Sequence, residues 1–476
     1  MKHTIKLETK IIRRIIIIKV FNRFISFVLF GFLTIEEHMK NNIRLIATLL
    51  IIVFLVYSCV KQVPETKIKT GNVILIHPDG AGLSAWNALR ILDKGPDGET
   101  NWDKLPNIGL YKSHTENSLT TSSNAGATMH SFGQKVPYHS YGMNGNNKLT
   151  ALSGEDKSIL IEARDAGIAT GIINSGSIVE PGTGVFAASD ERRDHYEEIT
   201  KKIIESGVDL IMSGGEEWML PEGVYGRHGY GKRTDGLNLI HIARDKGYEV
   251  VYTLEEMKNI PFDTKKLLGV FALSATFNDK TEEELKKLGL PNYNPEAPTI
   301  AEMTETAIRV LKNTGKQFFL VVEEEGTDNF PNHNNANGTF EALKRADDAI
   351  GVALEFQQKE QNTLVLVTSD SEAGGMEICG YRYQDVDDNF ITPEKESNGA
   401  PVDGSEGTKS RPFFSKEDQF GRKLPFHVAW STLNDTYGSV VVKAIGVNSY
   451  LSNGLIDNTD IYRIMYASLF GKLLDK

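Results

Sequence analysis

Short apolar runs typical of β-strands alternate with helical patterns along the chain from Asn72 onward. The apolar runs are NVILIH, ATGIIN, VDLIMSGG, YEVVYT, FFLVVEEE and TLVLVTSD, and VVVKAIG follows near the end. Between them lie helical patterns such as SILIEARDAG, HYEEITKKIIESG and AEMTETAIRVLKN. This alternation predicts an α/β fold, a three-layer sandwich in which helices cover both faces of a central, mostly parallel sheet. Functional residues of such a sheet gather beyond the carboxyl ends of its strands.

Four acidic residues lie at or just after the ends of the predicted strands. Asp79 follows NVILIHP, Glu323 follows FFLVV, Asp328 comes five residues later, and Asp370 follows TLVLVTS. In a parallel sheet these carboxylates converge on one edge, where they would repel one another and raise each other's pKa. Divalent cations remove that cost, and carboxylates are ligands of hard cations. One such residue is typical of a turn or a helix cap, but four together favour a metal site, either catalytic or purely structural.

A serine pair opens a run of small residues with helical potential, in TTSSNAGATMHSFG. A serine at the start of a helix lies where backbone N–H groups favour an oxyanion or a phosphate. A nearby metal ion would lower its pKa and make it a nucleophile. The alternative is that Ser122 or Ser123 only caps the helix.

The N-terminal region has the pattern of an export signal. Residues 39–59 have a basic start, an apolar run and the small Ser58 before Cys59, which resembles a bacterial lipoprotein processing site. We therefore predict that residues 1–38 are over-called upstream sequence and that residues 60–71 form a polar tether. The mature protein would be exported and held at the cell envelope, in the periplasm or on the outer surface, by a lipid on Cys59. The alternative is one or two true transmembrane helices.

Composition narrows the remaining possibilities. The net charge of −11 over 476 residues argues against a nucleic-acid partner. The two cysteines, Cys59 and Cys379, provide no disulfide framework. Residues 72–476 are predicted to form the catalytic domain, with residues 381–424 as a polar, turn-rich surface insertion that could act as a lid.

The order and spacing of several sequence blocks resemble those of the alkaline phosphatase family. The blocks include NVILIHPDGAG, TTSSNAGATMHSFG, AEMTETAIRVLKNTGKQFFLVVEEEGTDN and NTLVLVTSDSEAGG. The resemblance covers nearly all of residues 72–474. It implies a small phosphorylated substrate, a phosphoserine intermediate, bound divalent cations and, as in many members, a homodimer.

The resemblance also implies roles for individual residues. Ser123 would be the nucleophile, and Arg193 would bind the phosphate through two N–H groups, although Arg192 is an adjacent alternative. The implied metal ligands are Asp79, Glu180, Thr183, Glu323, Asp328, Asn332, Asp370, Ser371 and Asp435. Thr183 is included because Gly182 stands where the family has a magnesium-binding threonine or serine.

Three of these positions depart from the family, which has zinc-binding histidines there. The residues are Asn332, Ser371 and Asp435, so oxygen donors replace imidazole nitrogens. Because zinc prefers nitrogen and sulfur whereas Mg²⁺, Ca²⁺ and Mn²⁺ prefer oxygen, we predict Mg²⁺ binding, with Ca²⁺ or Mn²⁺ as alternatives and weak Zn²⁺ binding. Histidines near the motif segments could each supply one nitrogen, although a surface or core role is the plainer interpretation. These histidines are His77, His130, His333 and His427.

The sequence therefore predicts an exported, metal-dependent phosphomonoester hydrolase. Related activities on the same fold, against phosphodiesters or sulfate esters, remain alternatives. The lost histidines motivate another alternative, a catalytically inactive surface lipoprotein that binds metal or phosphate. In a weaker interpretation, Asp79, Asp328 and Asp370 are structural calcium ligands only, but Ser123 and Arg193 argue against it.

Overall fold

The computed structural model describes residues 67–476. The predicted over-called segment (residues 1–38), the predicted signal peptide, the predicted lipidation site Cys59 and most of the predicted tether lie outside the described residues. Within residues 67–476, no helix combines the length and the apolar character needed to cross a membrane.

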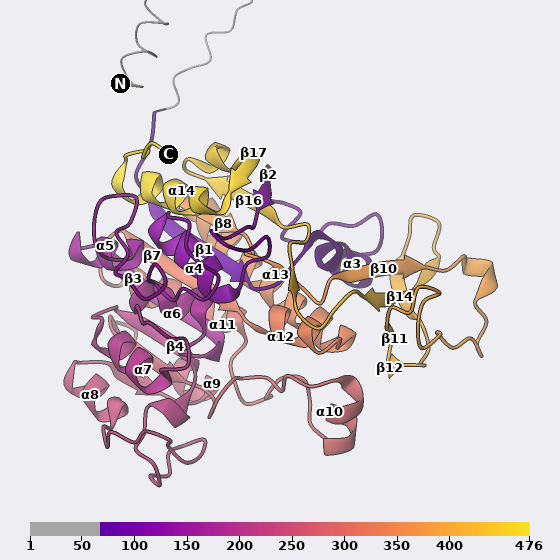
Figure 1. Ribbon diagram of the computed structural model, residues 1–476, viewed down its shortest axis with the longest axis horizontal. Helices are drawn as coiled ribbons and strands as arrows, with labels where there is room; N and C mark the ends of the chain where they lie inside the picture. Colours follow the sequence, from indigo (N-terminus) through magenta and orange to yellow (C-terminus); the bar gives the residue numbers. More distant parts are fainter. Residues whose placement is uncertain (1–66) are drawn as a thin grey trace, which may run out of the picture. The chain divides into compact units, whose positions relative to one another are not determined.

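The central sheet contains ten strands within the described part of the chain, in the order β17-β2-β16-β8-β1-β7-β3-β4-β6-β5 (Figure 1). The strands are β1 (Asn72–Pro78), β2 (Asn107–Lys112), β3 (Ala169–Ser177), β4 (Leu210–Gly214), β5 (Glu249–Val251), β6 (Leu267–Val270), β7 (Phe318–Glu324), β8 (Thr363–Val367), β16 (Val441–Gly446) and β17 (Gly454–Asp457). Of these ten, β16 is antiparallel to its neighbours β8 and β2, and the other neighbouring pairs are parallel. The predicted mostly parallel sheet is confirmed.

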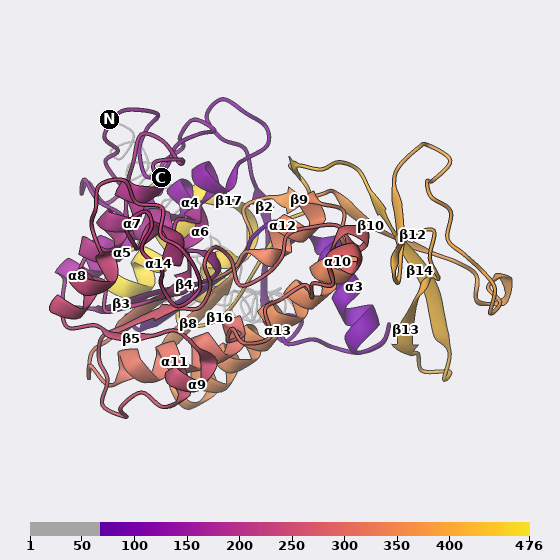
Figure 2. The ribbon, with the colours of Figure 1, turned by 90° about the horizontal axis from the view of Figure 1, so that it is seen from below.

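Helices cover both faces of this sheet, as the alternating side chains of β1 show. Val73 and Leu75 belong to one hydrophobic core, whereas Ile74 and Ile76 belong to a second. The helices of the first face are α4 (Ser123–Phe132), α5 (Ile159–Asp165), α6 (Pro181–Ala187), α7 (Tyr196–Glu205), α8 (Leu239–Asp245) and α14 (Asn458–Phe470). Those of the second are α3 (Leu83–Asp93), α9 (Leu254–Lys258), α11 (Ile300–Lys312) and α13 (Ala336–Lys359). Because successive side chains of a strand point to opposite faces, β1 is buried on both sides, and the three-layer prediction is confirmed (Figure 2).

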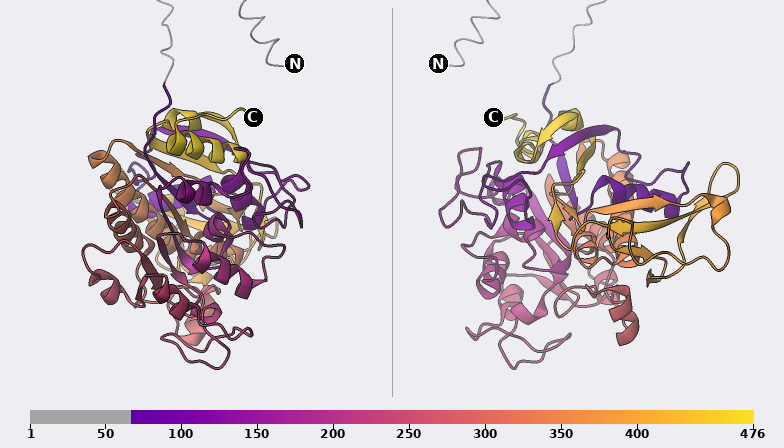
Figure 3. Two further views of the ribbon diagram at one scale, coloured as in Figure 1. Left: turned by 90° about the vertical axis from the view of Figure 1, so that its left-hand side faces the viewer. Right: turned by 45° about the vertical axis from the view of Figure 1, so that its right-hand side comes forward.

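An antiparallel sheet forms a lobe beside the central sheet (Figure 3). Its strands are β10 (Met376–Gly380), β11 (Val402–Gly404), β12 (Gly407–Thr408), β13 (Phe413–Glu417) and β14 (Lys423–Trp430). Residues 381–424, predicted as a surface insertion, supply β11, β12 and β13. The lobe contacts α10 (Glu282–Leu288), where the backbone N–H of Thr408 donates to Glu283 at 2.9 Å.

Three neighbouring strands bring the predicted acidic residues together. Strand β1 lies between β8 and β7, and His77 near its end is paired with Glu323 of β7. After β7 the chain turns into α12 (Gly326–Asn332), which carries Asp328. A short pair of strands, β9 (Glu372–Ala373) and β15 (Asp435–Thr436), brings Asp435 to the same edge.

Candidate active site

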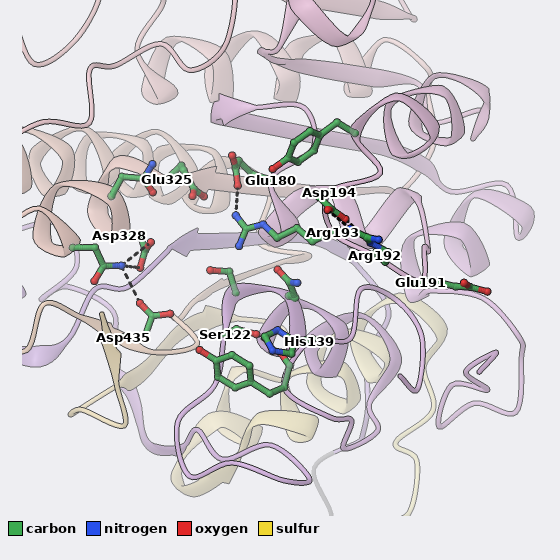
Figure 4. Close-up of a pocket in the computed structure, with 16 residues that line it drawn as sticks. Ser122, His139, Glu180, Glu191, Arg192, Arg193, Asp194, Glu325, Asp328 and Asp435 are labelled. Atoms are coloured by element: carbon green, nitrogen blue, oxygen red, sulfur yellow. Dashed lines mark hydrogen bonds and ion pairs between the residues drawn. The ribbon is translucent and has the colours of Figure 1, made fainter. Parts of the chain in front are cut away.

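A pocket of about 530 Å³ opens at the carboxyl ends of the central strands (Figure 4). The predicted site residues that line it are Ser123, Glu180, Arg193, Asp328, Asn332 and Asp435. Asp79, Glu323 and Asp370 are fully buried, and Asp79 adjoins the pocket through its contact with Ser123. Of the described residues, none between 381 and 424 lines this pocket, so the lobe does not cover it in this structure.

The buried carboxylates at the ends of β1, β7 and β8 form the acidic centre of the site. Asp79, Glu323 and Glu325 present oxygens within 4.8 Å of one another. Burial raises the pKa of Asp79 well above its usual value, and repulsion by Asp370 raises it further. Burial also raises the pKa of Asp370, to about 6.

These carboxylates leave several oxygens unsatisfied. Within residues 67–476, both oxygens of Asp79, both of Asp370 and Oε1 of Glu323 are buried without a hydrogen-bond partner. The hydroxyl of Ser371 is buried and unpartnered as well, among the described side chains. Unpaired buried carboxylates are costly, because each loses its hydration without a compensating contact. The residues present therefore fit a divalent cation at this centre.

Asn332 connects two further carboxylates at the edge of the pocket. Its side-chain nitrogen donates to both oxygens of Asp328 and to Asp435, each at 3.1 Å. Its side-chain oxygen accepts from the backbone N–H of Gly374 at 3.2 Å. As it lies, Asn332 directs N–H groups rather than an oxygen at the carboxylates, so it holds Asp328 and Asp435 in place instead of presenting a ligand atom.

Thr183 likewise contacts a carboxylate. Its hydroxyl donates to Glu323 at 3.1 Å, and Asn174 donates to both Thr183 and Glu323. Gly182 is required here, because a Cβ at this position would lie 1.7 Å from Oε1 of Glu323. Helix α6 can therefore lie against Glu323 only because this residue has no side chain.

The structure distinguishes the two adjacent serines at the start of α4. Ser122 is the N-cap: its hydroxyl accepts from the backbone N–H of Ala125 and donates to the carbonyl of Tyr138. Ser123 is the first residue of the helix, and its hydroxyl lies close enough to Asp79 to lower the pKa of that carboxyl. Gly126 lets the same helix lie against Asp370, since a Cβ there would lie 2.1 Å from Oδ2 of Asp370. Ser123 therefore lines the pocket and also contacts Asp79 of the acidic centre.

The two adjacent arginines point to different partners. Arg193 forms an ion pair with Glu180 at 2.9 Å, and its side chain is 43% exposed. Arg192 pairs instead with Asp194, away from Glu180, and is 64% exposed (Figure 4). Burial alone would lower the pKa of Arg193, but Glu180 and Glu325 outweigh burial and raise the pKa above its usual value. Of the two arginines, Arg193 is therefore the one whose guanidinium is paired with a predicted metal ligand, Glu180.

Comparison with known proteins places this arrangement in a family. The family model described as alkaline phosphatase matches residues 70–470. The chain belongs to the alkaline phosphatase family. The chain is 26% identical over 456 residues to the tissue-nonspecific alkaline phosphatase of Rattus norvegicus, covering 85% of this chain and 84% of that one. It is 25% identical over 448 residues to alkaline phosphatase 4 of Bacillus subtilis, covering 85% and 90%.

A solved structure of the same family has the same fold. The alkaline phosphatase from the Antarctic bacterium TAB5 superposes with a TM-score of 0.64 at 25% identity, covering 84% of this chain and 99% of that chain. Membership in the alkaline phosphatase family supports hydrolysis of phosphoric esters and the use of divalent metals.

The four histidines considered as substitutes for the lost ligands lie in different surroundings. His130 accepts or donates a 2.6 Å hydrogen bond with the hydroxyl of Tyr111, as a core histidine does. His333 is exposed, and His427 lies on β14 in the lobe. His77 is 1% exposed and lies within 3.8 Å of Asp79, Glu323 and Asp370. Among these four, His77 is the one that the structure places at the acidic centre.

Two further residues at the site were missed by the sequence analysis. Glu325 lines the pocket and is the last residue of the EEE run at the end of β7. Asn174 lies in β3 and binds Glu323. Both positions had the same signal as the predicted carboxylates, a polar residue near the end of a buried strand.

Proposed function

We propose that the protein is a metal-dependent phosphomonoester hydrolase that acts through a phosphoserine at Ser123. The observation that carries this proposal is the position of Ser123 on the pocket, next to the unsatisfied buried carboxylate of Asp79. Membership in the alkaline phosphatase family supports the general activity, ester hydrolysis at phosphorus. The choice of monoesters rests on the ordered sequence blocks.

The cations would be held by Asp79, Glu323 and Asp370, with Asp328 and Asp435 at the edge of the pocket. Bound there, divalent cations would neutralise the carboxylates, polarise phosphoryl oxygens and lower the pKa of Ser123. The excess of oxygen donors favours Mg²⁺, Mn²⁺ or Ca²⁺. A TAB5 alkaline phosphatase mutant, 25% identical with a TM-score of 0.63, is described with Mg bound, which supports Mg²⁺ as one cofactor.

The side chains of the pocket then provide the remaining steps. Arg193 binds two phosphate oxygens, and the first N–H groups of α4 favour the negative charge. The Oγ of Ser123 loses its proton and attacks phosphorus in line, so that the Oγ–P bond forms while the bond to the leaving oxygen breaks and that oxygen takes up a proton. The oxygen of a water molecule then bonds to phosphorus as the Oγ–P bond breaks, and a proton from that water returns to Oγ, which releases phosphate and regenerates the serine.

The experiment that tests this proposal compares three ester classes under four metals. Purified protein is assayed with p-nitrophenyl phosphate, bis-p-nitrophenyl phosphate and p-nitrophenyl sulfate, each with Mg²⁺, Mn²⁺, Ca²⁺ or Zn²⁺. We expect the monoester to be turned over fastest, with Mg²⁺ or Mn²⁺ supporting more activity than Zn²⁺. Faster turnover of the diester or the sulfate would replace the proposal with that activity. Binding of inorganic phosphate without turnover under any metal would show the inactive binding protein instead.

Replacing Arg193 with glutamine is expected to raise KM for p-nitrophenyl phosphate by about tenfold. This is the lower end of the range expected when hydrogen bonds to a charged group are lost. The lower end applies because the side chain is partly exposed and screened by solvent. The matched control is Arg192→Gln, which removes a guanidinium that pairs with Asp194. Steady-state kinetics of both variants decides the matter: an equal or larger effect at Arg192 would contradict the assignment of Arg193.

We also propose that the protein is exported and lipid-anchored through Cys59, as the pattern of residues 39–59 indicates. Phosphate released at the cell envelope would then be available for import. Mass spectrometry of the mature N-terminus checks this, because an unlipidated terminus would remove the anchor. Homodimer formation stays a prediction, and light scattering of the purified protein tests it.

A further inference from the structure

His77 lies in the middle of the acidic centre. Its Nε2 is 3.8 Å from Oδ1 of Asp79 and 3.7 Å from Oδ1 of Asp370, and its Nδ1 is 3.7 Å from Oε1 of Glu323. These separations are longer than hydrogen bonds. Within residues 67–476, Nε2 has no hydrogen-bond partner, and neither do the three oxygens that face the ring.

The surrounding backbone holds the imidazole in this position. His77 is two residues beyond Leu75 on β1, so it continues the face of the strand that packs toward α4. It is paired with Glu323 on β7. A Cβ on Gly182 would lie 2.6 Å from Nδ1 of His77, so the glycine at the start of α6 leaves the space that the ring occupies. The position of the His77 ring at the acidic centre is therefore fixed by the pairing of β1 with β7 and by its packing against Gly182.

One buried ion would satisfy all of these atoms together. A buried nitrogen and two buried carboxylates without hydrogen-bond partners are each costly, and the 3.7–3.8 Å between them is too long for a direct hydrogen bond. Two ligand atoms that each lie about 2.1 Å from one ion are separated by at most about 4 Å, which the observed 3.7 and 3.8 Å satisfy. We propose that Nε2 of His77 is a nitrogen ligand of the cation held by Asp79 and Asp370.

This inference deepens the proposed function, since both require cations at the same carboxylates. It changes the expected metal preference at one position, where an imidazole joins the oxygen donors. Imidazole suits Zn²⁺ and similar ions, whereas Mg²⁺ and Ca²⁺ gain little from it. Removal of the ring should therefore weaken Zn²⁺ binding much more than Mg²⁺ binding.

The experiment measures metal binding directly, without reliance on turnover. The full-length protein is stripped of metal and titrated calorimetrically with Zn²⁺ and with Mg²⁺, as wild type, His77→Gln and His333→Gln. We expect His77→Gln to weaken Zn²⁺ binding by at least about tenfold. Loss of a residue that only hydrogen-bonds to a metal ligand already lowers metal affinity by about that factor. The Mg²⁺ affinity should change by less than about threefold. His333→Gln, which removes an exposed imidazole close in sequence, should match wild type for both metals.

A second measurement includes a test on the wild-type protein, and that test does not depend on how well the variant folds. Wild-type protein saturated with Mn²⁺ is examined by pulsed electron paramagnetic resonance, which detects nitrogen coordinated to the ion. Imidazole coupling in the wild type and in His333→Gln, but not in His77→Gln, supports the inference. A wild-type spectrum without nitrogen coupling, or coupling retained in His77→Gln, overturns it.

These results also separate the inference from the proposed function. A protein that binds cations and hydrolyses phosphomonoesters but shows no nitrogen coupling loses the inference alone. A protein that binds no divalent cation loses the proposed function as well.

Discussion

Replacing Ser123 with alanine is expected to reduce phosphomonoesterase turnover by at least about a thousandfold, as loss of a nucleophile commonly does. The physical reason is that Ser123 brings its hydroxyl to the pocket and to Asp79 at the same time. The neighbouring hydroxyl of Ser122 is engaged with the carbonyl of Tyr138 and with the backbone of α4. It therefore cannot replace the lost group without abandoning the helix cap.

The matched control is Ser122→Ala. It should lower the free energy of unfolding by about 1 kcal/mol, the usual cost of losing an N-cap, while retaining far more activity than Ser123→Ala. Initial rates with p-nitrophenyl phosphate and urea denaturation of both variants provide the comparison. A Ser123→Ala protein that is folded and keeps more than about a tenth of wild-type turnover would refute the assignment of Ser123 as the nucleophile. Loss of a nucleophile normally lowers the rate by several powers of ten.

Removal of divalent cations is expected to abolish activity and to destabilise the fold in a pH-dependent way. In the metal-free protein, burial and mutual repulsion raise the pKa of Asp79, and burial raises that of Asp370 to about 6. These carboxyls hold protons in the folded state that they release on unfolding. The stability that these carboxyls contribute to the metal-free protein is therefore fully present below the usual aspartate pKa, and it is lost as pH rises through the raised values. For Asp370 alone, a shift from 3.8 to about 6 corresponds to about 3 kcal/mol.

Urea denaturation of chelator-treated protein between pH 5 and pH 8, with and without Mg²⁺, measures this effect. Mg²⁺ at about one hundred times its dissociation constant should add about 2.7 kcal/mol of stability, and more at the higher pH. Asp79→Asn removes one of the repelling charges, so its metal-free stability should depend less on pH than that of the wild type. If the stability of the metal-free wild type rises with pH, or if no divalent cation changes it, then these carboxylates do not form a cation site.

The central sheet and its helices could be predicted because their signals are local. Strands β1, β7 and β8 are runs of apolar residues that end in polar ones, and α11 and α13 show helical periodicity over more than ten residues. Strand β2 and the lobe were not predicted as strands. Their sequences are short and mixed in polarity, and they are held by partners distant in the chain, such as the pairing of Cys379 with His427.

Within the site, the carboxylates followed from the rule that parallel strands end at one edge, whereas the details depended on tertiary contacts. The distinction between Ser122 and Ser123 is made by the carbonyl of Tyr138. The orientation of the Asn332 amide is set by the backbone N–H of Gly374, 42 residues away in the sequence. A single histidine in an apolar strand such as His77 has no distinctive pattern, and its place becomes evident only when β1 pairs with β7.

The most direct test of a cation centre beside Ser123 is an anomalous-scattering map from crystals grown with Mn²⁺ or Zn²⁺. We expect anomalous peaks within coordination distance of Asp79 and Asp370, adjacent to the Ser123 hydroxyl, with the Nε2 of His77 bound to one of the ions. A map whose ions lie only on surface carboxylates, with the Asp79 and Asp370 oxygens bonded to protein or water alone, would contradict this expectation.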